Sequence, residues 1–452
     1  MLAGQALAKD NYDFSAVCST GQTLYYKIIS DTEPYAVAVT CPNKTQNVVK
    51  LYKGYTEPTG DLVIPEMVTH NGKTYSVTCI GEDAFSCCEN LTTVTIPNSV
   101  DSIGKFAFYT CDGLKSITIP NSVTTICYRA FFDCDGLETV NLGNSVEKIG
   151  EQAFGYCKAL TSVSIPESVK YIGCSAFAYW DEYPKCLQNV EFASVESLCS
   201  IKFEHWDANP LFFAQELHIK GEPIVNLIIP ETIQSIGDYA FYGCTSIKSA
   251  TISNSVKSIG EAAFAGCCEL VTVDMPNSIE SIGKSSFAGC NNLTSITIPY
   301  SVSNIGEYAF GECDKLMEFN VASDNAKYSS DGGVLFNKDK TTLICYPTGR
   351  TGAYTIPHTV KTIWNDAFFH CSKVTSITIP NSVTEIGPSA FCGCDSLYSI
   401  TIPNSVEKIC DGAFIGKNLV VYCEASSKPK GWHRKWNKEW FSGRTPVVWG
   451  KL

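Results

Sequence analysis

One 23-residue pattern, repeated along most of the chain, limits the possible folds more than any other feature of the sequence. A clear copy runs from Leu114 to Gly136, LKSITIPNSVTTICYRAFFDCDG. Further copies begin at Leu91, Leu137, Leu160, Ile224, Ile247, Leu270, Leu293, Thr351, Val374 and Leu397, and a looser first copy begins at Leu62. A fixed period of this length is typical of solenoids, in which each repeat forms one coil of a stack.

Each copy contains the pattern of two short strands and a turn. Ile117 and Ile119 alternate with outward Ser and Thr residues, which predicts a strand with one buried face. Pro120 ends this strand because it cannot donate a ladder hydrogen bond. The segment Val123–Ile126 predicts a second extended stretch, and Ala130-Phe131 predicts a short helical turn that plugs the coil. Stacked coils then bury one another's apolar sides.

The motifs SITIPNSV (Ser116 to Val123) and IGEQAF (Ile149 to Phe154) resemble those of the BspA-like leucine-rich-repeat family. The resemblance covers about Leu62 to Asn418. It implies an α+β repeat fold, namely a right-handed leucine-rich-repeat solenoid with a parallel β-sheet, short helical turns and a β-rich N-terminal cap. It also implies export to the surface of an anaerobic host-associated bacterium, and binding of host proteins or other cells.

Composition excludes several classes of function. The formal net charge of −12 argues against nucleic acid as a partner, because phosphate binding needs clustered Lys and Arg. No run of 18 apolar residues is present, so the sequence predicts no membrane span. The segment Gln5-Ala6-Leu7-Ala8 resembles the small-residue end of an export signal, although an ordinary chain start would also fit.

The 23 cysteines follow the repeat and do not have the spacing of a metal site. Because nine of them share one position of the repeat, we expect small apolar groups packed at a turn, present as thiols. CxxC pairs are absent from the sequence, so neither zinc nor any other metal or cofactor is expected. The nine cysteines are Cys111, Cys134, Cys157, Cys244, Cys267, Cys290, Cys313, Cys371 and Cys394.

The ends of the chain depart from the repeat and are interpreted as caps. Residues 1–61 contain alternating stretches and predict a β cap, residues 62–418 predict the solenoid, and residues 419–452 predict a C-terminal cap. Trp432, Trp436 and Trp440 are spaced by four, which places them on one face of a helix. We expect them to plug the last coil, with an aromatic platform for sugar or peptide as the alternative.

Two insertions, 180–223 and 316–350, interrupt the register. The second contains Asp331-Gly332-Gly333, a hairpin turn signal. Both insertions keep enough apolar residues to continue the core, which predicts enlarged coils. Insertions also map to one face of a solenoid, which predicts binding protrusions instead. The sequence leaves both interpretations open.

Few residues suggest catalysis. The best candidate for acid–base chemistry is Glu204-His205-Trp206-Asp207, in which a carboxylate lies on each side of the histidine. No nucleophile stands nearby in sequence, and a loop that packs Trp206 inward explains the same residues. Asp181-Glu182 supplies only two carboxylates, a weak site for a cation. We therefore expect no enzymatic activity.

The outward strand positions are richer in hydroxyl groups. They include Thr118, Thr297 and Thr378, and stacking of the coils predicts two nearly continuous ladders of Ser and Thr on the sheet face. Simple β-propensity explains these ladders. A flat polar surface for a protein or glycan explains them equally directly.

These patterns predict a secreted or cell-surface recognition and adhesion protein that binds host extracellular or microbial surface proteins. Two alternatives remain. The first is a glycan-binding scaffold that stacks sugars on Trp180, Tyr183 and Trp206, and the second is a hydrolase with its site near His205 in the first insertion. Asp331 at the hairpin tip is a further candidate for ligand contact.

Overall fold

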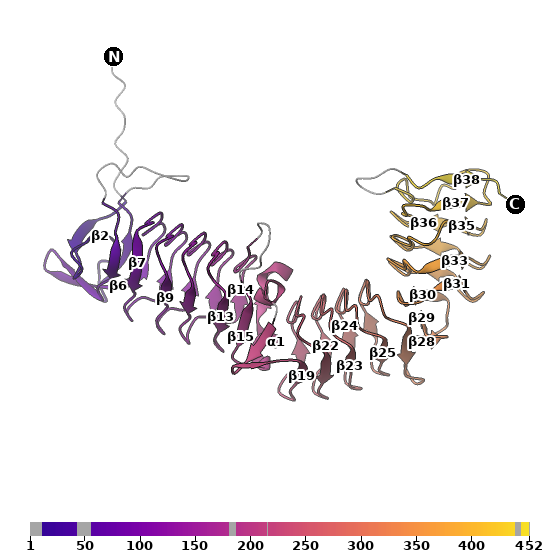
Figure 1. Ribbon diagram of the computed structural model, residues 1–452, viewed down its shortest axis with the longest axis horizontal. Coiled ribbons are helices and arrows are strands. Elements are labelled where there is room, and N and C mark those ends of the chain that lie inside the picture. Colours follow the sequence, from indigo (N-terminus) through magenta and orange to yellow (C-terminus); the bar gives the residue numbers. More distant parts are fainter. Residues whose placement is uncertain (1–10, 43–55, 180–186, 215, 439–443, 452) are drawn as a thin grey trace, which may run out of the picture. The chain divides into compact units, whose positions relative to one another are not determined.

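The computed structural model describes residues 11–42, 56–179, 187–214, 216–438 and 444–451. The chain divides into two compact units, Met1–Pro223 and Ile224–Leu452, and each is described by itself. In both units the repeat forms stacked coils with parallel strands and little helix (Figure 1).

Each coil of unit 1 contributes one strand to each of two sheets. Partners in neighbouring coils pair in register, as when Thr139 pairs with Ser116 and Lys148 with Thr125. The first sheet is interrupted between β7 and β9 and between β11 and β13, and it holds β4 (Gly60–Val63), β7 (Leu91–Thr95), β9 (Ser116–Thr118), β11 (Thr139–Asn141), β13 (Ser162–Ile165), β15 (Asn189–Phe192), β17 (Glu216–Ile219) and β18 (Glu222–Pro223). The second holds β6 (Lys73–Ile80), β8 (Ser102–Ile103), β10 (Thr125–Ile126), β12 (Lys148–Ile149), β14 (Tyr171–Ile172) and β16 (Lys202–Phe203).

The third side of each coil is a turn and not the short helix that the sequence predicts. Arg129 and Asp133 have φ angles of 51° and 58°, which lie outside the helical region. The amide of Phe131 donates to the carbonyl of Ala153 in the next coil at 2.8 Å, whereas a helix would direct it back along its own turn. The helices among the described residues are α1 (Val195–Ser200), η1 (Trp206–Ala208) and η2 (Pro210–Phe212).

The start of unit 1 is an antiparallel sheet that continues into the second sheet of the solenoid. Strands β1 (Phe14–Val17), β2 (Thr23–Ser30) and β3 (Ala36–Thr40) pair antiparallel, and β3 pairs in parallel with β6. Strand β5 (Met67–His70) forms a hairpin with β6, which in turn pairs with β8. This sheet therefore supplies hydrogen bonds to the first edge of the stack.

Unit 2 repeats the plan with a hairpin built into its second sheet. The first sheet is interrupted after β23, β27 and β33, and it holds β19 (Asn226–Ile229), β21 (Ser249–Ile252), β23 (Thr272–Asp274), β25 (Ser295–Ile298), β27 (Glu318–Val321), β31 (Gly352–Thr355), β33 (Val374–Thr378), β35 (Ser399–Ile402), β37 (Val420–Cys423) and β38 (Val447–Trp449). The second sheet is interrupted after β26. Its first part holds β20 (Ser235–Ile236), β22 (Ser258–Ile259), β24 (Ser281–Ile282) and β26 (Asn304–Ile305), and its second part holds the hairpin β28 (Tyr328–Asp331) and β29 (Val334–Asn337), then β30 (Thr342–Cys345), β32 (Thr362–Ile363), β34 (Glu385–Ile386) and β36 (Lys408–Ile409).

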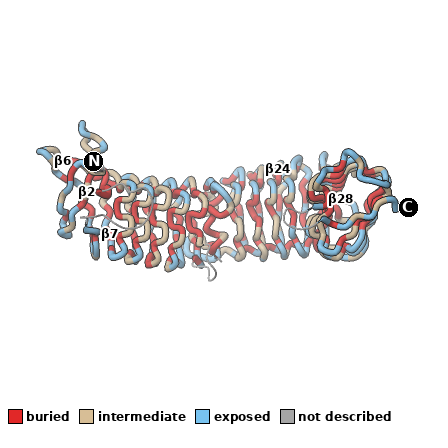
Figure 2. Tube along the Cα trace, turned by 90° about the horizontal axis from the view of Figure 1, so that it is seen from above, coloured by how far each residue is buried: buried red, intermediate tan, exposed pale blue. Residues whose placement is uncertain are grey.

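A ladder of phenylalanine rings fills the centre of each stack, and the buried residues line the inside of the coils in Figure 2. Phe264 is fully buried and stacks on Phe241 and Phe287, with ring centroids 5.0 and 5.3 Å apart. The repeated cysteine lies beside this ladder, and the Cys290 thiol donates to the carbonyl of Phe264 at 3.2 Å. The cysteine therefore satisfies a buried carbonyl as well as filling space.

Two of the C-terminal tryptophans, Trp432 and Trp436, pack against the preceding coil without forming a helix. Trp432 and Trp436 are buried, and the indole nitrogen of Trp432 donates to the carbonyl of Val406 at 3.0 Å. Trp432 forms a β-bridge with Ile409 and Trp436 lies in a turn, so the predicted helical face is wrong. Their burial also rules them out as an exposed aromatic platform. Trp440 lies outside the described residues.

Candidate functional site

The outward positions of the first sheet form an exposed polar face in each unit. Thr118 in β9, Thr297 in β25 and Thr378 in β33 are exposed, because each lies between two buried isoleucines that are its neighbours in the chain. The outward direction of the predicted ladders is therefore confirmed. Whether these threonines contact a ligand stays a prediction.

In unit 1 this face is hollowed between β7 and β9. The described backbone joins these strands only through the amide of Lys115 and the carbonyl of Thr92, at 3.5 Å, whereas β4–β7 and β9–β11 form regular ladders. The separation leaves about 910 Å³ of empty space, open to solvent. The hollow is lined by Thr93, Val94, Thr95, Ile96, Asn98, Ser116, Thr118, Ile119, Pro120 and Asn121.

A side-chain hydrogen bond joins the first insertion to the turn of the preceding coil. Asp207 accepts a hydrogen bond from the Ser175 hydroxyl and also contacts His205 Nδ1 at 3.0 Å. The sequence placed no nucleophile near this histidine, but folding brings Ser175 to the same carboxylate. In a catalytic triad the histidine lies between the hydroxyl and the carboxylate. Here the aspartate lies between them, so His205 does not receive the Ser175 proton.

Among the other candidate groups of this insertion, the Trp206 ring lies beside His205, with ring centroids 5.3 Å apart, while Glu204 and His218 have other printed partners. Trp206 is half-buried and packs its ring edge-to-face on Phe212, with centroids 4.8 Å apart. His218 contacts Glu216 at 3.1 Å. Glu204 accepts from the amide of Cys174 at 3.0 Å, and its pKa is lowered mainly by a hydrogen bond from Tyr171. Trp180, Tyr183 and the pair Asp181-Glu182 lie outside the described residues.

The second insertion is an enlarged coil whose hairpin tip packs against the solenoid. Gly332 and Gly333 have φ angles of 52° and 80°, as the predicted two-residue hairpin turn requires. The carbonyl of Gly333 accepts from the amide of Phe319 at 2.9 Å, and Arg350 donates to the carbonyl of Gly332. The tip is therefore held against β27, as an enlarged coil requires, and a role of the tip in binding stays a prediction. Asp331 is exposed and pairs with Lys340 at 2.8 Å.

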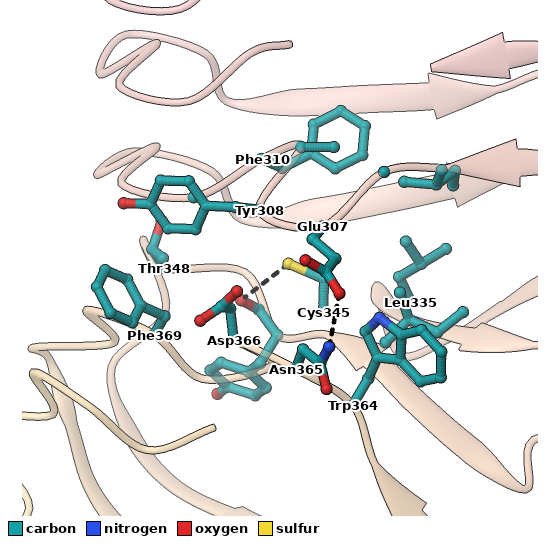
Figure 3. Close-up of a pocket in the computed structure, with 16 residues that line it drawn as sticks. Glu307, Tyr308, Phe310, Leu335, Cys345, Thr348, Trp364, Asn365, Asp366 and Phe369 are labelled. Atoms are coloured by element: carbon teal, nitrogen blue, oxygen red, sulfur yellow. Dashed lines mark hydrogen bonds between the residues drawn. The ribbon is translucent and has the colours of Figure 1, made fainter. Parts of the chain in front are cut away.

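A cleft lies beside this hairpin, where one coil has a shortened turn (Figure 3). Leu343 pairs with Ile363 and Gly352 pairs with Val374, so eight residues separate the paired positions in this coil where ten separate them in the next coil. The shorter segment leaves about 440 Å³ of empty space between the turn after β26 and the turn after β32. We call this space the turn cleft; its walls include residues 305–311, 344–348 and 364–369.

Side chains from the two walls of the turn cleft reach one another. Asn365 Nδ2 donates to Glu307 Oε1 at 2.7 Å, and the Tyr308 and Phe369 rings meet edge-to-face at 5.1 Å. Figure 3 shows the carboxyl groups of Glu307 and Asp366 projecting into the space around Cys345. Because of these bridges, only about 30 Å³ admits a water-sized group, which is room for about one or two waters.

The turn cleft favours ligands that carry positive charge. Burial, followed by the nearby charge of Glu307, raises the pKa of Asp366 to about 6, although Lys284 partly offsets both effects. A cation in the cleft would relieve this repulsion. Burial also raises the pKa of the Cys345 thiol, so the thiol stays protonated and is a poor nucleophile at neutral pH.

Neither a metal site nor a membrane span is present in the part of the chain that the structure describes. No group of three or more His, Cys, Asp or Glu side chains in these residues is placed to hold a metal ion. The described helices are also too short and too polar to cross a bilayer.

Comparison of the repeat with known families decides the identity of the scaffold. The model of the BspA type leucine rich repeat region, with six copies, matches residues 78–206, 219–332 and 346–428. The chain belongs to this BspA-type family. The resemblance drawn from the Ser116–Val123 and Ile149–Phe154 motifs is thus confirmed. No protein of curated function matches the chain in sequence.

Several solved structures of bacterial leucine-rich repeat proteins are similar to this chain. A leucine-rich repeat protein from Bacteroides ovatus is 23% identical over 95% of this chain and 98% of its own, with a TM-score of 0.47. A leucine rich cell surface protein from Faecalibacterium prausnitzii is 26% identical over 91% of this chain and 89% of its own, with a TM-score of 0.37. A leucine-rich repeat protein from Eubacterium ventriosum is 28% identical over 45% of this chain and 62% of its own, with a TM-score of 0.37.

Within this BspA-type chain, sequence reasoning identified the polar face and missed the turn cleft. Thr118 follows from strand alternation alone. Glu307 and Asp366 are 59 positions apart and occupy ordinary repeat positions, so neither stands out by itself. The sequence signal that could have indicated the cleft is the short length of the segment between Leu343 and Gly352. A shortened turn in one coil must leave space beside the turns of the neighbouring coils.

Proposed function

We propose that this BspA-type chain is an exported surface protein that recognises a partner protein through the polar face of its first sheet. Members of the family are typically surface proteins, and leucine-rich repeats commonly serve as protein-binding scaffolds. The observation that carries the proposal is the hollow between β7 and β9, lined by exposed hydroxyl and amide side chains.

The chemistry of this hollow suits a protein surface. Thr93, Thr95, Ser116 and Thr118 have short side chains, which lose little rotamer entropy when a partner covers them. Their hydroxyl groups both donate and accept, so they adapt to the mixed donors and acceptors of a folded partner. Asn121 adds an amide with both functions at the strand end.

A matched pair of arginine substitutions tests the polar face. Thr118→Arg places a long charged side chain in the hollow, while Thr124→Arg places the same group on the second sheet of the same coil, where Thr124 is also exposed. Binding of the full chain is measured against matrix proteins and against proteins captured from microbial surface extracts. We expect Thr118→Arg to weaken binding at least tenfold and Thr124→Arg to leave it unchanged. Equal binding by both variants contradicts the proposal.

Glycan binding is the second candidate, and an aromatic strip on the turn side of unit 1 favours it. Tyr109, Phe132 and Tyr156 are partly exposed and lie in sequence along the stack, with ring centroids 5.7 and 5.1 Å apart. Arg129 lies over the Phe132 ring at 4.6 Å. A glycan array with the full chain decides this candidate: signals that Tyr156→Ala abolishes and Thr118→Arg leaves intact would replace the protein partner with a sugar.

We also predict that the chain has no hydrolase activity. The geometry behind this prediction is the order Ser175–Asp207–His205, in which the hydroxyl contacts the carboxylate and not the histidine that would act as its general base in a triad. Glycosidase, esterase and peptidase substrates are assayed with the full chain and with His205→Ala. Turnover that is present in the parent chain and lost in the variant would make the first insertion an active site.

A further inference from the structure

Backbone amides of each turn normally bond to the next coil. In unit 2 the amides of Tyr239, Phe241 and Gly243 donate to carbonyls of the following turn, each at 2.8 Å. The next two turns repeat this pattern at 2.7 to 3.0 Å, the second of them through Ser285, Phe287 and Gly289. Each turn is therefore a rung of a hydrogen-bonded ladder on the third side of the solenoid.

The ladder is interrupted at the turn cleft. The amides of Tyr308, Phe310 and Glu312 occupy the same donor positions, but no carbonyl or side chain of the described residues accepts from them. On the opposite wall the carbonyl of Ala367 accepts from Tyr346 at 2.8 Å, whereas the structure gives the carbonyls of Asn365 and Phe369 no donor within the described chain.

The interruption follows from the shortened coil. The segment from Leu343 to Gly352 is two residues shorter than the equivalent segment of the next coil. It therefore makes one hydrogen bond to the next turn, from the Tyr346 amide, and then leaves the turn side. Thr348 donates instead to the carbonyl of Cys313, and Gly349 donates to Leu316 at 2.8 Å. The turn cleft therefore has donors on one wall and acceptors on the other, as a missing rung requires.

We propose that the turn cleft binds a basic peptide segment of a partner protein, which enters as the missing rung of the turn ladder. Its carbonyls accept from Tyr308 and Phe310, and its lysine or arginine side chain meets Asp366 and Glu307. The mode is a form of strand addition, in which main-chain bonds supply affinity and a side-chain pocket supplies specificity. The site is separate from the sheet hollow near Thr118 and does not rely on it.

Charge selects a basic segment over a neutral or acidic one. Glu307 and Asp366 line the cleft, and Lys284 is the cation that partly offsets their charge at Asp366. Just outside the lining, Glu312 lies 3.7 Å from a ring nitrogen of His370. The raised pKa of Asp366 is a sign that its charge lacks sufficient compensation. The bridges between Asn365 and Glu307 and between Tyr308 and Phe369 are made by side chains alone, so rotamer changes open the cleft.

The binding test uses the full chain and two blocked pentapeptides. The first is acetyl-Ala-Gly-Lys-Gly-Ala-amide, and the second carries an acetylated lysine in place of the free one. Saturation-transfer difference NMR is expected to show binding of the first peptide, with at least tenfold weaker binding of the second, because the charge-assisted hydrogen bond is lost. Asp366→Asn and Glu307→Gln should weaken binding of the lysine peptide by about tenfold each.

Glu261→Gln is the matched control, because Glu261 follows an Ile-Gly pair as Glu307 does, but in a coil whose ladder is complete. This variant should bind like the parent. Melting temperatures of all three variants check that they fold. No binding of the lysine peptide at millimolar concentration, or equal binding of the acetylated peptide, overturns the proposal.

Hydrogen exchange distinguishes a completed rung from simple charge attraction. At a peptide concentration ten times the Kd, amide exchange in residues 306–313 should slow about tenfold, while exchange in residues 283–290 stays unchanged. Binding that leaves exchange in 306–313 unchanged would show a surface ion pair and overturn the rung. The Thr118→Arg variant tests the sheet face alone, and the peptide and exchange experiments test the turn cleft alone. A failure of the proposed function is therefore distinguishable from a failure of the turn-cleft proposal.

Discussion

At the residue scale, Asp366 combines an unfavourable charge with a site for a ligand. Its φ angle of 56° lies in the left-handed region, which Asp and Asn adopt more readily than most residues. Its carboxyl group faces Glu307, Lys284, Tyr308 and the Cys345 thiol. Such a residue lowers the free energy of unfolding when no ligand is bound. A residue kept for a structural role would raise that free energy, so the cost indicates a binding role.

Asp366→Asn should therefore stabilise the protein at pH 7 and not at pH 4. The pKa of Asp366 is raised from 3.8 to about 6 in the folded state, so the folded state holds the proton more tightly than the unfolded state. Stability from this group is present below about pH 4 and is lost as the pH rises through about 6. We expect a gain of about 1 kcal/mol at pH 7, allowing for solvent screening of a partly exposed group. Urea unfolding at the two pH values measures it, and a loss of stability at pH 7 contradicts it.

The phenylalanine ladder makes a second prediction at the scale of one residue. Phe264→Ala removes a fully buried ring from between Phe241 and Phe287, so it should destabilise the protein by ~3–5 kcal/mol. Tyr398→Ala is the control, because Tyr398 is 65% exposed and should cost less than about 0.5 kcal/mol. Equal shifts in the two urea midpoints would mean that Phe264 does not carry the core.

The sequence predicted inward and outward residues well because a period of two fixes them. Ile117 is buried and Thr118 exposed, as alternation requires. Contacts between distant positions were less predictable. Ser175 meets Asp207 only because stacking brings one coil over the next, and no local pattern around either residue indicates that meeting.

At the element scale, the third side of the coil shows where local pattern misleads. A segment such as YRAFF contains residues that suit a helix, which is why a helical turn was expected around Phe131. The neighbouring coil offers carbonyls at the right spacing, and the amides of Arg129, Phe131 and Asp133 bond to them. Hydrogen bonds to the neighbouring coil thus outweigh the small helix propensity of this segment.

The hairpin of the second insertion was predicted from Asp331-Gly332-Gly333, but its contact with the solenoid was not. A Cβ atom on Gly333 would lie 2.8 Å from Glu318 Cβ and 2.9 Å from an Arg350 nitrogen, whereas one on Gly332 would meet nothing within 4 Å. The two glycines therefore share a turn and differ in their surroundings.

This difference predicts unequal effects of alanine in the same turn. Gly332→Ala should cost about 1 kcal/mol, the strain of a positive φ. Gly333→Ala should cost about 2–3 kcal/mol, because the same strain is joined by overlap with β27. Thermal unfolding of the two variants is compared directly. Equal costs would mean that the tip does not pack against β27.

At the scale of the whole molecule, stability is built from contacts between neighbouring coils. Almost every hydrogen bond and ring contact described above joins one coil to the next, which is the arrangement of a repeat array. Stability in such an array is a sum of local terms, so an end left uncovered weakens the coils beside it first. The repeat predicted this stack from the sequence, while its handedness stays a prediction.

We propose that residues 419–452 form the cap of unit 2, and their removal tests this local character. Truncation after Asn418 removes Trp436, whose carbonyl accepts from Phe414 at 3.0 Å and whose ring meets the Phe414 ring at 5.7 Å. It also removes Trp432, which covers Ile409.

Hydrogen exchange should then rise most in residues 397–416, less in 374–394, and not measurably in 102–126 of unit 1, because each coil contacts only its neighbours. Trp364→Ala, which changes a tryptophan that is 42% exposed, is the control and should leave protection of 397–416 unchanged. A uniform rise from 235 to 416 would show instead that unit 2 opens as one cooperative body, since loss of a single end would then be felt equally by every coil.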